Sequence, residues 1–117
     1  MGFTNIQHVT NQQQTGGIPF VNMQSDHAGE SWACQPGFQN NIGRNLPIPQ
    51  MPDYNNGLWI YTRKGLCQII DQNWQVTGKW DGGNPVIFLD GGDHGVGSNI
   101  SVTIQSDGDI AMEKASS

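Results

Sequence analysis

GLWIYTRKGLCQIID, residues 57–71, consists of two short apolar segments on either side of Lys64-Gly65. The letters LWIY place apolar or aromatic side chains on both faces of an extended chain, which is typical of a central β-strand. Gly65 can take the positive φ that a two-residue hairpin turn requires, so residues 66–71 are expected to return antiparallel. The stretch therefore predicts a β-hairpin in the middle of a sheet, with Trp59 in the core.

The rest of the C-terminal half continues this pattern of short segments and Gly-rich turns. The further segments are NWQVTGKW (73–80), NPVIFLD (84–90), NISVTIQ (99–105) and DIAMEK (109–114). Alternation of apolar and polar residues, as in NISVTIQ, indicates a strand with one buried face. No stretch of ten or more residues combines helical periodicity with capping residues. We therefore predict an all-β fold, an antiparallel β-sandwich or small barrel of about eight strands.

The N-terminal half is harder to assign but is expected to belong to the same domain. A chain of 117 residues forms one domain, so residues 1–117 should share a single core. Residues 1–17 are mostly polar and predict an N-terminal arm or an edge strand. Residues 36–56 contain four prolines, which predicts a long Pro/Asn-rich loop.

Amides, rather than charges, supply most of the polarity. Charged residues make up 13% of the chain, where about a quarter is usual, whereas 11 Asn and 12 Gln are present. The net charge is −5 and the five Lys and Arg are scattered, so the chain offers no basic surface for nucleic acid and anionic membranes are disfavoured. Such a composition suits neutral polyhydroxylated ligands or a protein lattice.

No targeting segment is visible in the sequence. The first residues lack a charged segment followed by an apolar run, and no window approaches 18 apolar residues. We therefore expect no transmembrane segment. We also expect a protein that is cytoplasmic, released by a signal-independent route, or present as a mature form.

The two cysteines, Cys34 and Cys67, could form one disulfide. The alternative is two buried thiols that behave as small apolar residues, and the lack of an export signal favours it. Neither cysteine has the neighbours of a metal site in sequence.

The loop at residues 89–99 contains several side chains that could act in binding or chemistry. Asp90, Asp93, His94 and Asn99 lie in it among four glycines. One interpretation is a solvated Gly-rich connection without a cofactor. A second is a calcium site, which needs six to eight oxygen ligands and would use the two aspartates with backbone carbonyls.

Catalysis is not expected from this sequence. The Asp93-His94 pair could supply an acid and a base, which would make the protein a small hydrolase. However, no Ser or Cys nucleophile lies in a recognisable turn, and the two glutamates, Glu30 and Glu113, lie on distant predicted strands. We therefore predict that the protein is not an enzyme.

Four tryptophans divide into two groups by position. Trp59 and Trp74 lie inside strand patterns and are expected in the core. Trp32 and Trp80 lie near strand ends beside Gly-containing turns, where an exposed indole could stack on a sugar ring or lie at a lipid headgroup. Packing against the core is the alternative for this second pair.

Residues 73–104, NWQVTGKWDGGNPVIFLDGGDHGVGSNISVTI, resemble the final part of aegerolysin-type β-sandwich proteins. In that family a Trp-containing strand, a short turn, an apolar strand, a Gly-rich loop and a final I-x-V strand follow one another. The resemblance implies a small, acidic β-sandwich without a signal peptide that recognises membrane lipids. Some members act with a larger pore-forming partner, so a toxin-associated role is implied as well.

The segment Gln105-x-Asp107-x-Asp109-x-Ala111-x-Glu113 resembles the Gln-x-Asp-x-Asn-x-Val-x-Tyr motif of monocot mannose-binding lectins. It keeps the first two positions of that motif and differs at the last three. The resemblance implies a mannose pocket at this place, but the missing Asn and Tyr would leave its hydrogen bonds incomplete.

Three functional hypotheses follow from these observations. The favoured one is a non-enzymatic recognition module that binds a glycan or a membrane-lipid headgroup. The alternative is a structural or assembly subunit, of the phage or extracellular filament type, whose N-terminal arm and Pro-rich loop reach a neighbouring copy in a homo-oligomer. The third is the small hydrolase. The predicted ligand-binding residues are Trp32, Trp80, Asp90, Asp93, His94, Asn99, Asp107 and Asp109.

Overall fold

The structure is a computed structural model that describes residues 5–13, 20–25, 30–49, 57–72, 75–90 and 99–115. Ten β-strands lie in these residues. They are β1 (Asn5–Asn11), β2 (Val21–Ser25), β3 (Glu30–Cys34), β4 (Gln39–Pro47), β5 (Leu58–Thr62), β6 (Gly65–Gln72), β7 (Gln75–Trp80), β8 (Pro85–Leu89), β9 (Asn99–Ile104) and β10 (Ile110–Lys114). The described residues contain no helix that is long and apolar enough to cross a membrane.

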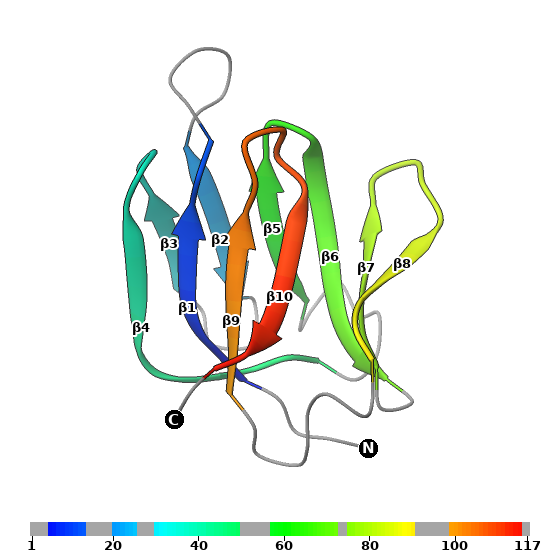
Figure 1. Cartoon of the computed structure of the whole chain (residues 1–117). Helices are drawn as coiled ribbons and strands as arrows, with labels where there is room; N and C mark the ends of the chain where they lie inside the picture. The colour runs from blue at the N-terminus through cyan, green and yellow to red at the C-terminus, as the bar shows by residue number, and fades with distance from the viewer. Residues whose placement is uncertain are drawn as a thin grey trace.

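The strands form two sheets that pack face to face (Figure 1). One sheet has four strands in the order β10-β9-β1-β4, and the other has six in the order β3-β2-β5-β6-β7-β8. All neighbouring strands are antiparallel except β1 and β9, which are parallel. The predicted all-β sandwich is confirmed, and the small barrel is wrong because both sheets have free edges. The estimate of about eight strands is too low.

The first correction concerns the N-terminal segment, which was predicted to be an arm or an edge strand. β1 instead lies inside the four-stranded sheet, between β9 and β4. The register shifts between Ile6 and His8, which marks a β-bulge. The extra residue allows both Ile6 and Val9, three positions apart, to face the core, where they are 0% and 3% exposed. A strict two-residue period could not predict this strand.

The second correction concerns the predicted Pro/Asn-rich loop at residues 36–56. Residues 39–47 form β4, which pairs antiparallel with β1 at the edge of the sheet. Pro36 precedes this strand and Pro47 is its last residue, so neither proline interrupts its interior. The described parts of the two segments expected to reach a neighbouring copy therefore pair with each other within one chain.

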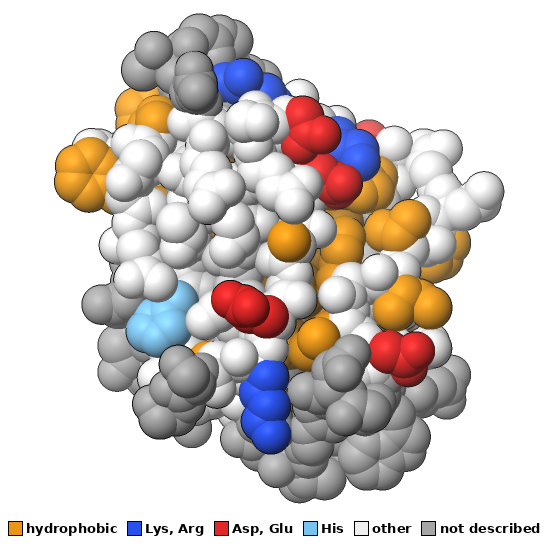
Figure 2. Space-filling model, viewed as in Figure 1, with side chains coloured by type: hydrophobic (Ala, Val, Ile, Leu, Met, Phe, Trp, Pro, Cys, Tyr) orange, Lys and Arg blue, Asp and Glu red, His pale blue; other side chains and the backbone are white. Residues whose placement is uncertain are grey.

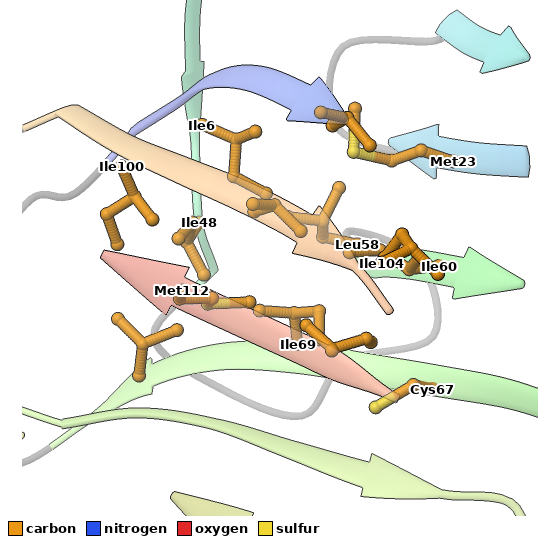
Figure 3. Packing of buried hydrophobic residues seen from close by; sticks show 14 of the residues in the cluster. Ile6, Met23, Ile48, Leu58, Ile60, Cys67, Ile69, Ile100, Ile104 and Met112 are labelled. Carbon is orange, nitrogen blue, oxygen red and sulfur yellow. The ribbon is translucent and has the colours of Figure 1, made fainter. Parts of the chain in front are cut away.

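The core lies between the two sheets (Figure 3). Every second residue of β9 faces this core, as the alternating sequence predicted: Ile100, Val102 and Ile104 are each 0% exposed. Each such side chain contributes about 1.5–3 kcal/mol when it is fully buried. The remaining buried apolar residues are Ile6, Val9, Val21, Met23, Cys34, Ile48, Leu58, Ile60, Cys67, Ile69, Val76, Leu89, Ile110 and Met112.

Buried polar groups join the two sheets at one end of the sandwich. Asn11, at the end of β1, donates from Nδ2 to the carbonyl oxygen of Cys34 at 2.9 Å. Its Oδ1 accepts from the backbone nitrogen of Gln13 at 2.9 Å. Gln13 Oε1 in turn accepts from the backbone nitrogen of Arg63 at 2.9 Å, in the turn after β5. Part of the amide content is therefore structural rather than available at the surface.

Both cysteines are buried, and they are not joined by a disulfide. Cys34 lies on the edge strand β3, whereas Cys67 lies on β6, with β2 and β5 between them. The Cys34 thiol donates to the carbonyl oxygen of Phe38 at 3.1 Å. Burial raises the pKa of the Cys67 thiol to about 12, with smaller opposing effects of Lys64 and Asp109. Two buried thiols, rather than a disulfide, describe this chain.

Candidate functional site

The outer face of the six-stranded sheet carries an aromatic pair from β5. Leu58 and Ile60 point inward and are fully buried. Trp59 and Tyr61 alternate with them and point outward, where Trp59 is half-buried and Tyr61 is 38% exposed. Residues two positions apart on a strand are about 7 Å apart on the same face. The two rings therefore form a continuous aromatic strip on the surface of the sheet.

Strand pairing surrounds each ring with defined neighbours. In the register of the sheet, Trp59 lies opposite Gln24 of β2 on one side and Gln68 of β6 on the other. Adjacent strands are about 4.8 Å apart, so both amides lie within side-chain contact distance of the indole position. The tryptophan is thus placed between two side chains that can both donate and accept hydrogen bonds.

Tyr61 has a comparable set of neighbours one row along the sheet. It lies opposite Asn22 of β2 and Leu66 of β6. Asn22 is exposed, and Leu66 is 37% exposed. The second row therefore combines an aromatic ring with one amide and one apolar side chain.

These two rows line a surface groove of about 280 Å³. It is lined by Asn22, Met23, Gln24, Ser31, Trp59, Tyr61 and Leu66. None of these described lining residues is charged. The volume is close to the lower limit of small-ligand sites, which span about 300–1,000 Å³. The groove therefore has the size and chemistry for a small uncharged polar ligand.

Gln68 lies opposite Trp59 on the β6 side but does not line the groove. Its Nε2 atom is buried and makes no hydrogen bond to any described residue. An amide donor without an acceptor costs about 1–3 kcal/mol.

Trp59 lines the groove but was not among the binding residues predicted from the sequence. The LWIY pattern predicted a strand buried on both faces, whereas the structure covers only the inner face with the second sheet. A signal was present in the neighbouring strands. The positions of β2 and β6 that face Trp59 both carry glutamine, and amides on a buried face would be costly.

Trp32 and Trp80, predicted to bind ligand, are placed differently. Both are partly buried and pack against the hydrophobic core, as the alternative interpretation expected. Neither lines the groove. The Trp80 ring also lies under the ammonium group of Lys64, which is 4.9 Å from the ring centroid.

Asp107 and Asp109 lie in the β9–β10 hairpin, where they act in the turn itself. Asp107 Oδ1 accepts from the backbone nitrogen of Asp109, and Asp109 Oδ1 accepts from that of Ile110, each at 2.9 Å. Asp109 also forms an ion pair of 3.3 Å with Lys64. Both partners are well exposed, so the pair contributes about 0–1 kcal/mol.

The predicted loop at residues 89–99 lies largely outside the described residues. Asp93 and His94 are among those not described, whereas Asp90 is exposed after β8. Asn99 begins β9, and its Oδ1 is buried without a hydrogen bond to any described residue. No group of three or more His, Cys, Asp or Glu side chains suited to a metal ion occurs in the described ranges.

The outer face of the four-stranded sheet shows mainly uncharged side chains (Figure 2).

No family model, curated protein or solved structure matches this chain. The resemblances to aegerolysin-type proteins at residues 73–104 and to mannose-binding lectins at residues 105–113 therefore stay predictions. The groove lies outside residues 73–104, and β5 and β2 supply most of it.

Proposed function

We propose that this protein is a non-enzymatic recognition module that binds a neutral sugar in the groove on the outer face of its six-stranded sheet. One observation carries the proposal. Trp59 and Tyr61 form an outward aromatic strip, and uncharged amides stand opposite both rings in the strand register.

The chemistry of a sugar ring matches both parts of this arrangement. A pyranose has aliphatic C–H groups on its faces, which pack on an aromatic ring, and hydroxyl groups around its rim. An amide side chain offers an acceptor and two donors, so Gln24 or Asn22 can pair with neighbouring hydroxyls. Placed side by side, the ring orients the sugar and the amides select its hydroxyl pattern.

The absence of charge among the described lining residues favours a neutral ligand over an acidic one. Among the groove residues that the structure describes, none is a Lys or Arg that could pair with a carboxylate, sulfate or phosphate group. The chain as a whole has a net charge of −5, which would repel anionic ligands. A neutral sugar can come from a free glycan or from the headgroup of an uncharged glycolipid, and both offer the same chemistry.

The rigid position of the groove supports a direct binding role. Its residues lie on β2, β3, β5 and β6, which pair consecutively in the sheet in the order β3-β2-β5-β6. Side chains held by a sheet lose little conformational entropy when a ligand binds. Its described lining consists of two amides, two aromatic rings, the hydroxyls of Ser31 and Tyr61, and two apolar side chains.

A glycan array tests the proposal. We expect signals on neutral glycans that persist in EDTA and no signals on sialylated or sulfated ones. Tyr61→Ala should lose the neutral signals, whereas the matched variant Phe38→Ala, which removes a ring that is 62% exposed outside the groove, should keep them.

Binding to lipid vesicles distinguishes a free glycan from a glycolipid headgroup as the source of the sugar. Vesicles of phosphatidylcholine with and without a neutral glycolipid should differ in binding if the headgroup is the ligand. A folded wild-type protein that binds neither the array nor either vesicle would overturn the proposal.

A further inference from the structure

We propose that the groove selects a neutral sugar that carries an acetamido group, and that Asn22, Tyr61 and Leu66 recognise this group. Because the recognition takes place in the same groove, it rests on the proposed function, and it names the class of sugar that the groove takes. The two rows of side chains that cross the sheet differ in chemistry, and this difference carries the proposal.

The first row suits the hydroxyl groups of a sugar. Ser31 of β3 lies opposite Gln24 of β2, and Gln24 lies opposite Trp59 of β5. A hydroxyl and an amide therefore follow one another on the same side of the indole. Both can donate to and accept from a sugar hydroxyl, and neither presents an aliphatic end to the ligand.

The second row offers an amide and an aliphatic side chain on opposite sides of an aromatic ring. Asn22 of β2 lies opposite Tyr61 of β5, and Tyr61 lies opposite Leu66 of β6. Asn22 is exposed, Tyr61 is 38% exposed and Leu66 is 37% exposed. A leucine side chain makes no hydrogen bond to a sugar hydroxyl, whereas a methyl group that covers it removes apolar surface from water. This row therefore suits a ligand group that combines an amide with a methyl group.

An acetamido group has both parts. Its N–H and its carbonyl oxygen are one donor and one acceptor, and the Asn22 carboxamide offers the matching acceptor and donor. Its methyl group is aliphatic and can lie against the edge of the Tyr61 ring and the Leu66 side chain. A single substituent of the sugar can therefore use all three side chains of the row.

The strand spacing fits a group of this size. Two spacings, about 10 Å, separate Asn22 from Leu66 across Tyr61. A hydrogen bond of about 2.9 Å at one end and a carbon–carbon contact of about 4 Å at the other leave about 3 Å between them. An acetamido group, which places its methyl carbon two bonds from its nitrogen and from its oxygen, fills this remaining length.

The spacing between the rows limits the size of the whole ligand. Trp59 and Tyr61 lie two positions apart on β5, about 7 Å. A pyranose that packs its face on one ring can reach the other only through a substituent or a neighbouring sugar residue. The groove volume of about 280 Å³ lies at the small end of ligand sites, so we expect one or two sugar residues to fill it.

Charge and hydrogen bonding separate the acetamido group from related substituents. An amino sugar carries a positive charge and an acidic sugar a negative one, and the groove residues that the structure describes include no charged side chain to pair with either. A deoxy sugar has a methyl group but no amide to pair with Asn22. Among these substituents, the acetamido group is the one that uses both Asn22 and Leu66.

Titration calorimetry with matched disaccharides tests this selectivity. N,N′-diacetylchitobiose and cellobiose differ only in acetamido against hydroxyl groups, and a second pair compares an N-acetylgalactosamine disaccharide with its galactose counterpart. We expect the acetamido member of at least one pair to bind at least about tenfold more tightly, because hydrogen bonds to Asn22 and a methyl contact with Leu66 are added.

Variants of the second row locate this preference. Leu66→Ser and Asn22→Ala should each reduce the ratio of the two affinities at least about threefold. Val86→Ser and Asn84→Ala are the matched variants, at exposed positions of the β7–β8 hairpin outside the groove, and should keep the ratio. Because all four side chains reach the surface, the variants should stay folded.

The outcomes separate the acetamido preference from the sugar groove itself. Equal affinity for both members of each pair, or array signals confined to neutral glycans without acetamido groups, would overturn the preference and leave the groove as a sugar site. A preference that persists in both Leu66→Ser and Asn22→Ala would overturn the role of the second row. A protein that binds no neutral glycan at all would overturn the preference and the proposed function together.

Discussion

Gln24 lies directly opposite Trp59 in the antiparallel β2–β5 ladder. Both side chains point to the outer face of the six-stranded sheet, because the residues that alternate with them, Met23 and Ile60, are buried in the core. Strand geometry fixes the amide and the indole at neighbouring positions before any ligand arrives. The proposed recognition of a sugar depends on this pairing of a polar and an aromatic side chain.

The first prediction concerns the donor at Gln24. Gln24→Glu keeps the shape of the side chain but replaces its amide donors with a carboxylate. We expect the dissociation constant for a neutral glycan selected on the array to rise about three- to tenfold, since one hydrogen bond contributes about 0.5–1.5 kcal/mol. Titration calorimetry measures the change. Gln105→Glu, at an exposed turn on the other sheet, should bind like wild type, and equal losses in both variants would point to a general charge effect instead.

The second prediction concerns the buried hydrogen bond between Gln13 and Arg63 that joins the two sheets. Gln13 is 2% exposed, and its Oε1 accepts from the backbone nitrogen of Arg63. Gln13→Ala removes this acceptor and should lower the free energy of unfolding by about 1–3 kcal/mol. Urea denaturation measures this free energy of unfolding. Gln12→Ala, at the exposed neighbouring position, should stay within about 0.5 kcal/mol of wild type. Equal stability of the two variants would show that the buried hydrogen bond contributes nothing.

The third prediction concerns pH and Cys67. Burial raises the pKa of this thiol from 9.0 to about 12 in the folded protein. Above pH 9.0 the unfolded chain loses a proton that the folded chain retains, so stability should fall as the pH rises towards 12. Below that window the thiol is protonated in both states and its contribution is constant.

Cys67→Ala isolates this effect from other groups that titrate in base. The free energy of unfolding of wild type should fall more steeply than that of Cys67→Ala between about pH 9 and pH 11. Parallel curves for the two proteins would contradict the raised pKa. The same burial should make Cys67 unreactive towards thiol reagents in the folded protein at neutral pH.

Local turn chemistry made the C-terminal half predictable. The turns at Lys64-Gly65 and Asp107-Gly108 were expected, and Gly65 and Gly108 have φ of 131° and 90°. Both hairpins depend on residues that are adjacent in sequence. Such local signals are present in the chain before any tertiary contact forms.

The N-terminal half could not be predicted in the same way. β1 pairs with β9, almost a hundred residues further along the chain, and a bulge breaks its alternation. β4 is rich in amides and is stabilised by its pairing with β1. Neither of these strand pairings leaves a local signal in the sequence, so the prediction rested on composition, which indicated an arm and a loop.

The site followed a similar pattern. Aromatic and amide residues were identified as the binding chemistry, but Trp32 and Trp80 were chosen because they lie near turns. In the structure these two pack against the core, whereas Trp59 and Tyr61 line the groove. Tertiary packing decides which face of a strand the second sheet covers. In this chain, the sequence signal for the uncovered face is an aromatic strand that lies between two strands with amide side chains.

The most direct test of the account is the affinity of Trp59 variants for one neutral glycan selected on the array. Trp59→Ala should raise the dissociation constant at least about tenfold, since stacking on a large aromatic ring is worth about 1.5–3 kcal/mol. Trp59→Phe should recover part of the loss, and Phe38→Ala should bind like wild type. A folded Trp59→Ala protein with wild-type affinity would contradict the proposed sugar site.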